Sequence, residues 1–257
     1  MTHDQLAQAL LQAVRSLDFG STADAHRQGQ PVQAFPSIDL AVVAFPARSA
    51  AVWANVMFSR EHPQGVVAHI DSSAGSVHNI RFLADIRDAQ GVSVAWLPQA
   101  DWGQWPWRTL AGPGPLDMVA PYPASLLKLM VAVGVGMAID WSLCRWDQPW
   151  PYAQQVRTIA QWGEDMIVTS SNEATSALVA LLHALGLINE QADPEAHHAL
   201  HHAFESRGLH TLRLAGTRKE GGWGKSVGSG VGQIQMTAWD TARLLWLLDP
   251  SAAVAPW

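Results

Sequence analysis

The pattern of apolar and polar positions changes character about halfway along the chain. Residues 3–16 carry leucine and valine at helical spacing, and Thr2 stands where an N-cap would be. Short β-branched or aromatic runs, bounded by turn residues, then predict strands at 38–45, 51–57, 65–70 and 92–97. The polar stretch 20–36 and the Trp-, Pro- and Gly-rich stretch 101–114 are typical of loops and irregular connections.

Helical patterns dominate the second half, where they predict helices at 125–139, 156–167, 170–185, 194–207 and 237–248, with a glycine-rich loop at 221–232. The 125–139 segment is almost entirely apolar apart from Lys128 and is too short to cross a bilayer, so we interpret it as a buried core helix. Its Gly134 and Gly136 would let a neighbour approach closely. Because strands gather early and helices late, the sequence predicts an α+β fold rather than an alternating α/β one.

Composition narrows the class of protein. The 257 residues are 48% apolar and 15% charged, with a net charge of −6. This length suffices for one large or two small domains, the apolar content argues against disorder, and the charge argues against nucleic-acid binding. No apolar run reaches about 18 residues, so no transmembrane helix is expected, and the single cysteine, Cys144, leaves no internal disulfide.

Ser125 and Lys128 are the first pair of candidate catalytic residues. Three residues apart on a helix, they share a face at its N-terminal end, where free N–H groups concentrate positive potential. Apolar surroundings disfavour the lysine cation, and a neutral amine beside a hydroxyl is a competent base for a serine nucleophile. The alternative is a buried helix whose lysine extends to the surface. Lysine is rare in this sequence, which otherwise has only Lys219 and Lys225.

Ser170 and Asn172 form a second pair at the start of the 170–185 helix. Both side chains can point into a cleft, where the hydroxyl can relay a proton and the amide can hold a substrate carbonyl. Ser170 and Glu173 also fit a capping box, and helix capping alone would explain the residue types at these positions. Both interpretations stay open on the sequence.

The two pairs, 45 residues apart and in this order, resemble the penicillin-recognising serine hydrolases, and most closely the class A β-lactamases. The first pair is similar to the family's S-x-x-K motif and the second to its S-D-N motif; the likeness covers roughly residues 115–250. The resemblance implies that Ser125 is the acylated nucleophile, with Lys128 as its base and its own N–H as half of an oxyanion hole. Ser170 would pass a proton to the leaving nitrogen, and Asn172 would bind the substrate amide.

The sequence departs from that family at three points. Ser171 stands where the class A enzymes have aspartate. No K-T-G follows the 237–248 helix, and the segment Lys225–Gly228 precedes that helix, so it is a poor substitute. For the deacylating glutamate only Glu220 is near the right place, outside the family's E-x-x-L-N pattern; a solvated loop acid beside Lys219 is the other interpretation. A truncated chain or an inactive relative would account for the missing K-T-G.

These features predict a serine hydrolase of the class A β-lactamase type, with an α+β fold of the β-lactamase/D-Ala-D-Ala-peptidase kind whose sheet is incomplete. Residues 115–257 would form the hydrolase region, and residues 1–114 a strand-rich region that we leave unassigned. The substrate would be a β-lactam or a related amide or ester, with no metal or organic cofactor. Two alternatives stay open. One is a degenerate binding or structural domain; the other is a D-Ala-D-Ala-peptidase-like protein that forms a slowly hydrolysed acyl-enzyme.

The expected partner is a small-molecule or peptide-like substrate, not nucleic acid, and the sequence leaves the oligomeric state open. The N-terminus lacks a basic segment followed by an apolar one, so the chain as it stands is expected in the cytoplasm. A periplasmic location would follow if the true start of the protein lies further upstream.

Four histidines in the 194–207 segment raise the question of a metal. The pairs His197/His201 and His198/His202 have the i, i+4 spacing with which two ring nitrogens can hold Zn²⁺ or Ni²⁺. No H-E-x-x-H pattern is present, and the sequence offers no convincing third ligand. We therefore interpret the cluster as a solvated helix face.

Overall fold

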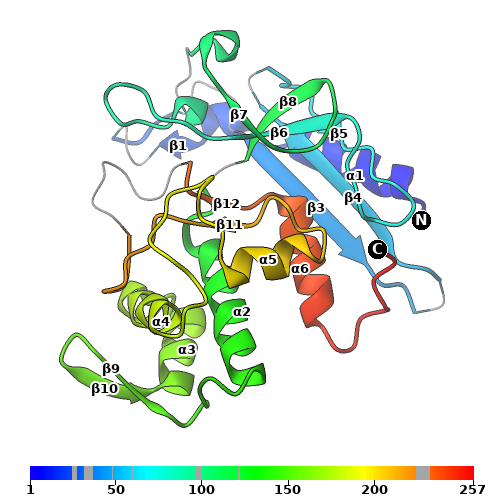
Figure 1. Ribbon diagram of the computed structural model, residues 1–257. Helices are drawn as coiled ribbons and strands as arrows, with labels where there is room; N and C mark the ends of the chain where they lie inside the picture. The colour runs from blue at the N-terminus through cyan, green and yellow to red at the C-terminus, as the bar shows by residue number, and fades with distance from the viewer. Residues whose placement is uncertain are drawn as a thin grey trace. The chain divides into compact units, whose positions relative to one another are not determined.

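The protein is a mixed α+β molecule (Figure 1). Its computed structural model spans residues 1–257 and describes all of them except 25–27, 32–36, 48, 60, 97–99, 121 and 224–231. The chain divides into two compact units. The first comprises residues 1–88, 92–120 and 237–257, and the second comprises residues 89–91 and 121–236.

The last helix is the main difference from the division expected at residue 114. Apart from residues 89–91, the chain stays in the first unit until Ala120 and returns to it at Thr237. It returns because α6 (Ala238–Leu248) packs on β3 (Ile38–Ala44) of the first unit. The backbone N–H of Ala238 also donates a 2.8 Å hydrogen bond to the Asp39 carboxylate on β3.

A three-stranded antiparallel sheet with a helix on each face forms the centre of the first unit. Its order is β3, β4 (Val52–Phe58) and β5 (Val66–Val67). Successive side chains of a strand point to opposite faces, so β4 divides its residues between two apolar clusters. α1 (His3–Arg15) covers the face of Val56 and Phe58, and α6 covers the face of Met57.

The predictions for this part are largely confirmed. α1 begins at the expected place, because Thr2 accepts the N–H of Gln5 while the Gln5 side chain accepts the N–H of Thr2, forming a capping box. β3 and β4 match the strands expected at 38–45 and 51–57. The strand expected at 65–70 is shorter, because only β5 pairs regularly with β4.

The first unit contains a second sheet, which the sequence did not predict. β6 (Ile80–Ala84) lies between β7 (Arg108–Ala111), which runs antiparallel to it, and β8 (Leu116–Ala120), which runs parallel. β7 falls inside the stretch expected to be irregular. The turn from β7 to β8 passes so close to the backbone of β6 that a Cβ on Gly114 would lie 2.0 Å from the carbonyl carbon of Asn79.

The strand expected at 92–97 is wrong for its described part. Ser93 makes a single bridge to Arg87, and η3 (Val94–Trp96) follows as a 3₁₀ turn; Leu97 lies outside the described residues. The buried Asp85 carboxylate accepts the Ser93 hydroxyl at 2.5 Å and the N–H of Ala95 at 3.4 Å. These local bonds compete with a strand ladder, which is why the segment turns.

Three helices form the centre of the second unit. They are α2 (Leu127–Asp140), α3 (Ile159–Val168) and α4 (Asn172–Ala184). A Cβ on Gly134 would lie 2.8 Å from Leu182, so the expectation of a close approach is confirmed there; nothing lies near Gly136, and there the expectation was wrong. Among the described residues no helix is both long and apolar enough to cross a membrane.

The remaining elements are short. The hairpin of β9 (Pro149–Tyr152) and β10 (Gln155–Thr158) was not predicted, and it delays the start of α3 from the expected residue 156 to Ile159. α5 (Ala199–Glu205) begins later than expected, because His198 is its N-cap. The other strands and 3₁₀ turns are β1 (Ala23–Asp24), β2 (Gln30–Pro31), β11 (Arg213–Leu214), β12 (Ile234–Gln235), η1 (Phe19–Ser21), η4 (Trp102–Gln104) and η5 (Ala124–Leu126).

Candidate active site

The candidate site lies within the second unit, where two segments meet. Ser125 stands in η5, the 3₁₀ turn that leads into α2, and Lys128 stands in the first turn of α2. Ser170 and Asn172 lie at the junction between α3 and α4. The packing of α2 against both α3 and α4 brings these two segments together. The structure thus joins four of the five residues that the sequence singled out.

Lys128 is the centre of the arrangement. Its side chain extends inward rather than to the surface, and the residue is only 4% exposed. Its Nζ lies 3.0 Å from Ser125 Oγ, 2.9 Å from Ser170 Oγ and 3.1 Å from Asn172 Oδ1. The Ser170 carbonyl oxygen is a fourth neighbour, at 2.9 Å. The alternative of a lysine extending to the surface is therefore wrong.

The two serine hydroxyls also contact each other. Ser170 Oγ lies 3.1 Å from Ser125 Oγ, so the two hydroxyls and the amine form a closed triangle of hydrogen-bonding groups. Burial lowers the pKa of Lys128 from its ordinary value, because the ammonium loses contact with water. A neutral amine can accept a proton from either hydroxyl. The arrangement thus offers a base, a nucleophile and a proton relay within hydrogen-bonding distance.

The capping interpretation of Ser170 is wrong. The N-cap of α4 is Ser171, whose Oγ accepts the N–H of Ala174 at 3.1 Å. Ser170 precedes the cap, with a positive φ of 56°, and its hydroxyl turns to Ser125 and Lys128 instead. Helix capping therefore explains the serine at 171 but not the serine at 170.

Backbone strain accompanies both halves of the site. Ala124, which precedes Ser125, has a φ of 47°, so two residues with side chains adopt left-handed conformations beside the triangle. Such conformations cost about 1–2 kcal/mol for an L-residue and persist only where the surrounding structure enforces them. Strain of this kind concentrates at functional sites.

Asp165 supports the Ser170 turn, and sequence reasoning missed it. Its backbone carbonyl accepts the N–H of Ser171 at 3.0 Å and the Thr169 hydroxyl at 2.8 Å. Its carboxylate pairs with the Arg157 guanidinium from β10. The spacing of Thr169 four residues after Asp165 could have indicated their hydrogen bond from the sequence. The ion pair of Asp165 with Arg157 could not be predicted, because Arg157 lies in a hairpin that the sequence did not reveal.

Glu220 does not join the other four residues. It is exposed in the turn after β11, where its carboxylate lies 3.9 Å from Lys219 Nζ, and it makes no hydrogen bond to the triangle or to Asn172. This position matches the solvated loop acid that the sequence offered as the other interpretation. The segment Lys225–Gly228, considered as a substitute for the K-T-G motif, lies outside the described residues.

The histidine cluster is not a solvated helix face. His197 and His202 are exposed, but His198 and His201 are buried, and the centroids of these two rings lie 3.8 Å apart with the ring planes tilted by 35°. Both buried rings hydrogen-bond to the backbone of Leu214 on β11. Among the described residues no group of three potential ligands is arranged to hold a metal ion.

Comparison with known proteins does not assign the chain to a family. No protein-family model, characterised protein or solved structure matches the chain. What the site can do chemically is therefore inferred from the arrangement of Ser125, Lys128, Ser170 and Asn172.

Proposed function

We propose that the protein is a serine acyl-transfer enzyme of the β-lactamase and D-Ala-D-Ala-peptidase type, in which Ser125 forms an ester with the acyl group of an amide or ester substrate. The observation that carries the proposal is the closed triangle of Ser125 Oγ, Lys128 Nζ and Ser170 Oγ, each pair separated by 2.9–3.1 Å. A nucleophile and its base within this distance, with the base held by further contacts, is the arrangement that nucleophilic catalysis requires.

In the proposed reaction Lys128 takes the proton of the Ser125 hydroxyl as Oγ attacks the substrate carbonyl carbon. The tetrahedral intermediate then expels the leaving amine or alkoxide, which takes a proton from the Ser170 hydroxyl, and Lys128 returns its proton to Ser170. The Asn172 side chain, held by its Oδ1 contact to Lys128, leaves its amide N–H₂ to orient the substrate. Water hydrolyses the ester in a second half-reaction.

Slow hydrolysis of the ester follows from the position of Glu220. Among the described residues no carboxylate hydrogen-bonds to Ser125, and Glu220 pairs with Lys219 instead, so we assign no acid to the activation of water for this step. A peptidase-like protein that accumulates its acyl-enzyme is therefore favoured over an efficient β-lactamase. A non-catalytic binding domain is the outcome that the experiment below must exclude.

The direct test is covalent labelling of Ser125. The protein is incubated with a penicillin and, separately, with a fluorophosphonate, which phosphonylates activated serines without regard to substrate, and the intact mass is measured. We expect one adduct with each reagent in the wild type and none in Ser125→Ala. Ser142→Ala, which removes an exposed serine elsewhere in the second unit, is the control and should label like the wild type.

The two reagents separate the possible outcomes. A fluorophosphonate adduct without a penicillin adduct, and with the penicillin unconsumed, supports the nucleophile but excludes β-lactam substrates. Consumption of penicillin without a stable adduct indicates rapid hydrolysis and contradicts the slow-deacylation argument. Failure of both reagents to react with folded wild-type protein would overturn the proposed function and leave a binding domain.

The neighbouring serines 170 and 171 provide a matched pair. Ser170→Ala removes the group that protonates the leaving nitrogen and should slow acylation by the penicillin by about 100-fold, within the range usual for one acid–base group. Labelling by the fluorophosphonate, whose leaving fluoride needs no proton, should change much less. Ser171→Ala removes the N-cap of α4 instead. It should leave the rate of acylation near that of the wild type while costing about 1 kcal/mol in the free energy of unfolding, measured with urea.

The reverse pattern would contradict these roles. If Ser171→Ala slowed acylation by the penicillin as much as Ser170→Ala did, both serines would act through the position of the α3–α4 junction, and the relay assigned to Ser170 would be wrong.

A further inference from the structure

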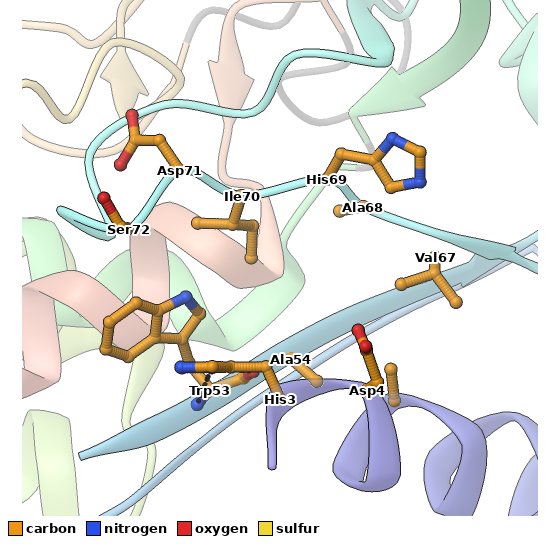
Figure 2. A pocket seen from close by; sticks show the side chains of 11 residues that line it. His3, Asp4, Trp53, Ala54, Val67, Ala68, His69, Ile70, Asp71 and Ser72 are labelled. Carbon is orange, nitrogen blue, oxygen red and sulfur yellow. Dashed lines mark hydrogen bonds between the residues drawn. The ribbon is translucent and has the colours of Figure 1, made fainter. Parts of the chain in front are cut away.

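The first unit contains a pocket of about 420 Å³ that the proposed reaction does not use. It lies between the N-terminal end of α1, the start of β4 and the segment that follows β5 (Figure 2). All of its lining residues fall between His3 and Ser72, so it is built entirely within the first unit. Its volume lies within the range of about 300–1,000 Å³ that small-molecule sites occupy.

The pocket exists because the sheet loses a strand at this edge. β5 pairs with Val56 and Met57 of β4, but the chain turns away after Ala68 and leaves Trp53 without a strand neighbour on that side. His3 covers the exposed strand edge instead. Its Nδ1 lies 3.0 Å from the backbone carbonyl oxygen of Trp53 and 3.2 Å from the backbone nitrogen of Trp53. Small side chains line the space between, namely Ala7, Ala54 and Ala68.

The apolar part of the pocket has an aromatic wall. Figure 2 shows the Trp53 indole at one end and Ile70 extending from the segment after β5 toward β4. The His3 ring packs on the indole with a centroid distance of 4.2 Å, which fixes the indole from one side. An indole face can bind either an apolar ring or a cation.

The charged groups of the pocket are acidic. Asp4 extends from the first turn of α1 toward the segment after β5 (Figure 2), and no described residue pairs with its carboxylate. The Asp71 carboxylate is held by the N–H groups of Ser73, Gly75 and Ser76. Although partial burial opposes ionisation of Asp71, hydrogen bonds from these neighbours lower its pKa, so it adds negative charge. The described residues that line the pocket include two histidines, His3 and His69, but no lysine or arginine.

We propose that this pocket binds a small primary amine with an apolar, preferably aromatic, body. The ammonium would pair with the Asp4 carboxylate, and the apolar body would lie between Ile70 and the Trp53 indole. The Asp4 carboxylate selects against anions, and the small side chains of Ala7, Ala54 and Ala68 leave room for an apolar group. This site is independent of the proposed reaction at Ser125.

The test compares three ligands that share a phenyl ring and differ in charge: 2-phenylethylamine, 2-phenylethanol and 3-phenylpropanoate. Titration calorimetry on the full chain should give a Kd for the amine about five-fold below that of the alcohol, and the weakest binding for the acid, since one exposed ion pair contributes about this factor. Asp4→Asn should remove the preference for the amine. Asp18→Asn, the same change at an exposed acid outside the pocket, should preserve it.

Trp53→Leu is an independent test, because it should weaken the binding of the amine and of the alcohol to the same extent. Its folding is checked by circular dichroism, since Trp53 also packs on Trp246. Equal Kd values for the three ligands, an amine preference that survives in Asp4→Asn, or the absence of amine binding at millimolar concentration would each overturn the proposal.

Discussion

Replacing Lys128 with arginine should slow acylation of Ser125 by about 10³-fold, within the range of about 10²- to 10⁴-fold for the loss of a positioned general base. Arginine keeps a positive charge at this position and can still donate hydrogen bonds, but its guanidinium cannot give up its proton to act as a base. The substitution therefore separates a catalytic role of the amine from a merely structural one. Second-order rates of fluorophosphonate labelling measure the effect.

The wild-type rate should also rise with pH. Burial lowers the pKa of Lys128, so the neutral amine forms at a lower pH than the ordinary lysine value of about 10.4. Labelling should increase as pH approaches this lowered pKa from below, and level off above it. A plateau reached well before pH 10 would support the neutral base.

Lys219→Arg is the control for this prediction, because Lys219 is exposed and pairs only loosely with Glu220, at 3.9 Å. It should retain both the wild-type rate and its pH dependence. A Lys128→Arg protein that folds and labels at the wild-type rate would show that Lys128 is a structural group, and it would remove the base from the proposed mechanism.

Acid should destabilise the protein through the two buried histidines. The N–H of Leu214 donates to His201 Nε2 at 2.9 Å, so that nitrogen carries no proton, and His201 Nδ1 donates to the Ala196 carbonyl at 2.6 Å. His198 Nδ1 likewise accepts the N–H of His201 at 3.3 Å, while its Nε2 donates to the Leu214 carbonyl at 3.0 Å. Protonating either ring would place a second donor against a backbone N–H.

Burial accordingly lowers the pKa of His198 to about 4 and that of His201 to about 3, and the charge of Arg213 acts in the same direction. In the unfolded chain both pKa values return to about 6.5. Below that pH the unfolded state binds protons that the folded state does not, so stability falls as the pH drops from about 6.5 toward 4. For one ring this amounts to about 3 kcal/mol, because one pKa unit corresponds to about 1.36 kcal/mol.

The measurement is the free energy of unfolding by urea at pH 7, 6, 5 and 4.5. His198→Gln should lose stability at pH 7, because it gives up hydrogen bonds, but it should show a shallower decline toward acid than the wild type. His197→Gln removes an exposed histidine from the same segment and should decline like the wild type. Parallel curves for all three proteins would mean that these rings do not control the acid response.

Most helices of this protein could be predicted because their signals are local. The capping box at Thr2, the helix that follows Ser125 and the glycine that ends α4 at residue 186 all depend on neighbours within a few positions. The missed strands are non-local. β6 pairs in parallel with β8 across more than thirty residues, and nothing in either segment alone specifies that partner.

The candidate site, too, was predictable from the sequence only in part. The types and order of Ser125, Lys128, Ser170 and Asn172 were enough to single them out, and the apolar helix was enough to predict a lysine with a lowered pKa. Whether Ser170 capped its helix or faced Lys128 could not be decided from the sequence, because Ser171 is an equally good cap one residue further on. That choice needed the packing of α2 against α3 and α4.

By itself, then, the sequence determined the α+β class and the pair of motifs around a lysine in an apolar helix, because periodicity and capping act over a few residues. Tertiary structure decided that α6 returns to the first unit, that Glu220 stays apart from Ser125, and that two histidines are buried against β11. Each of these depends on contacts between segments far apart in the chain, whose formation depends on the packing of the whole unit rather than on local residue preferences.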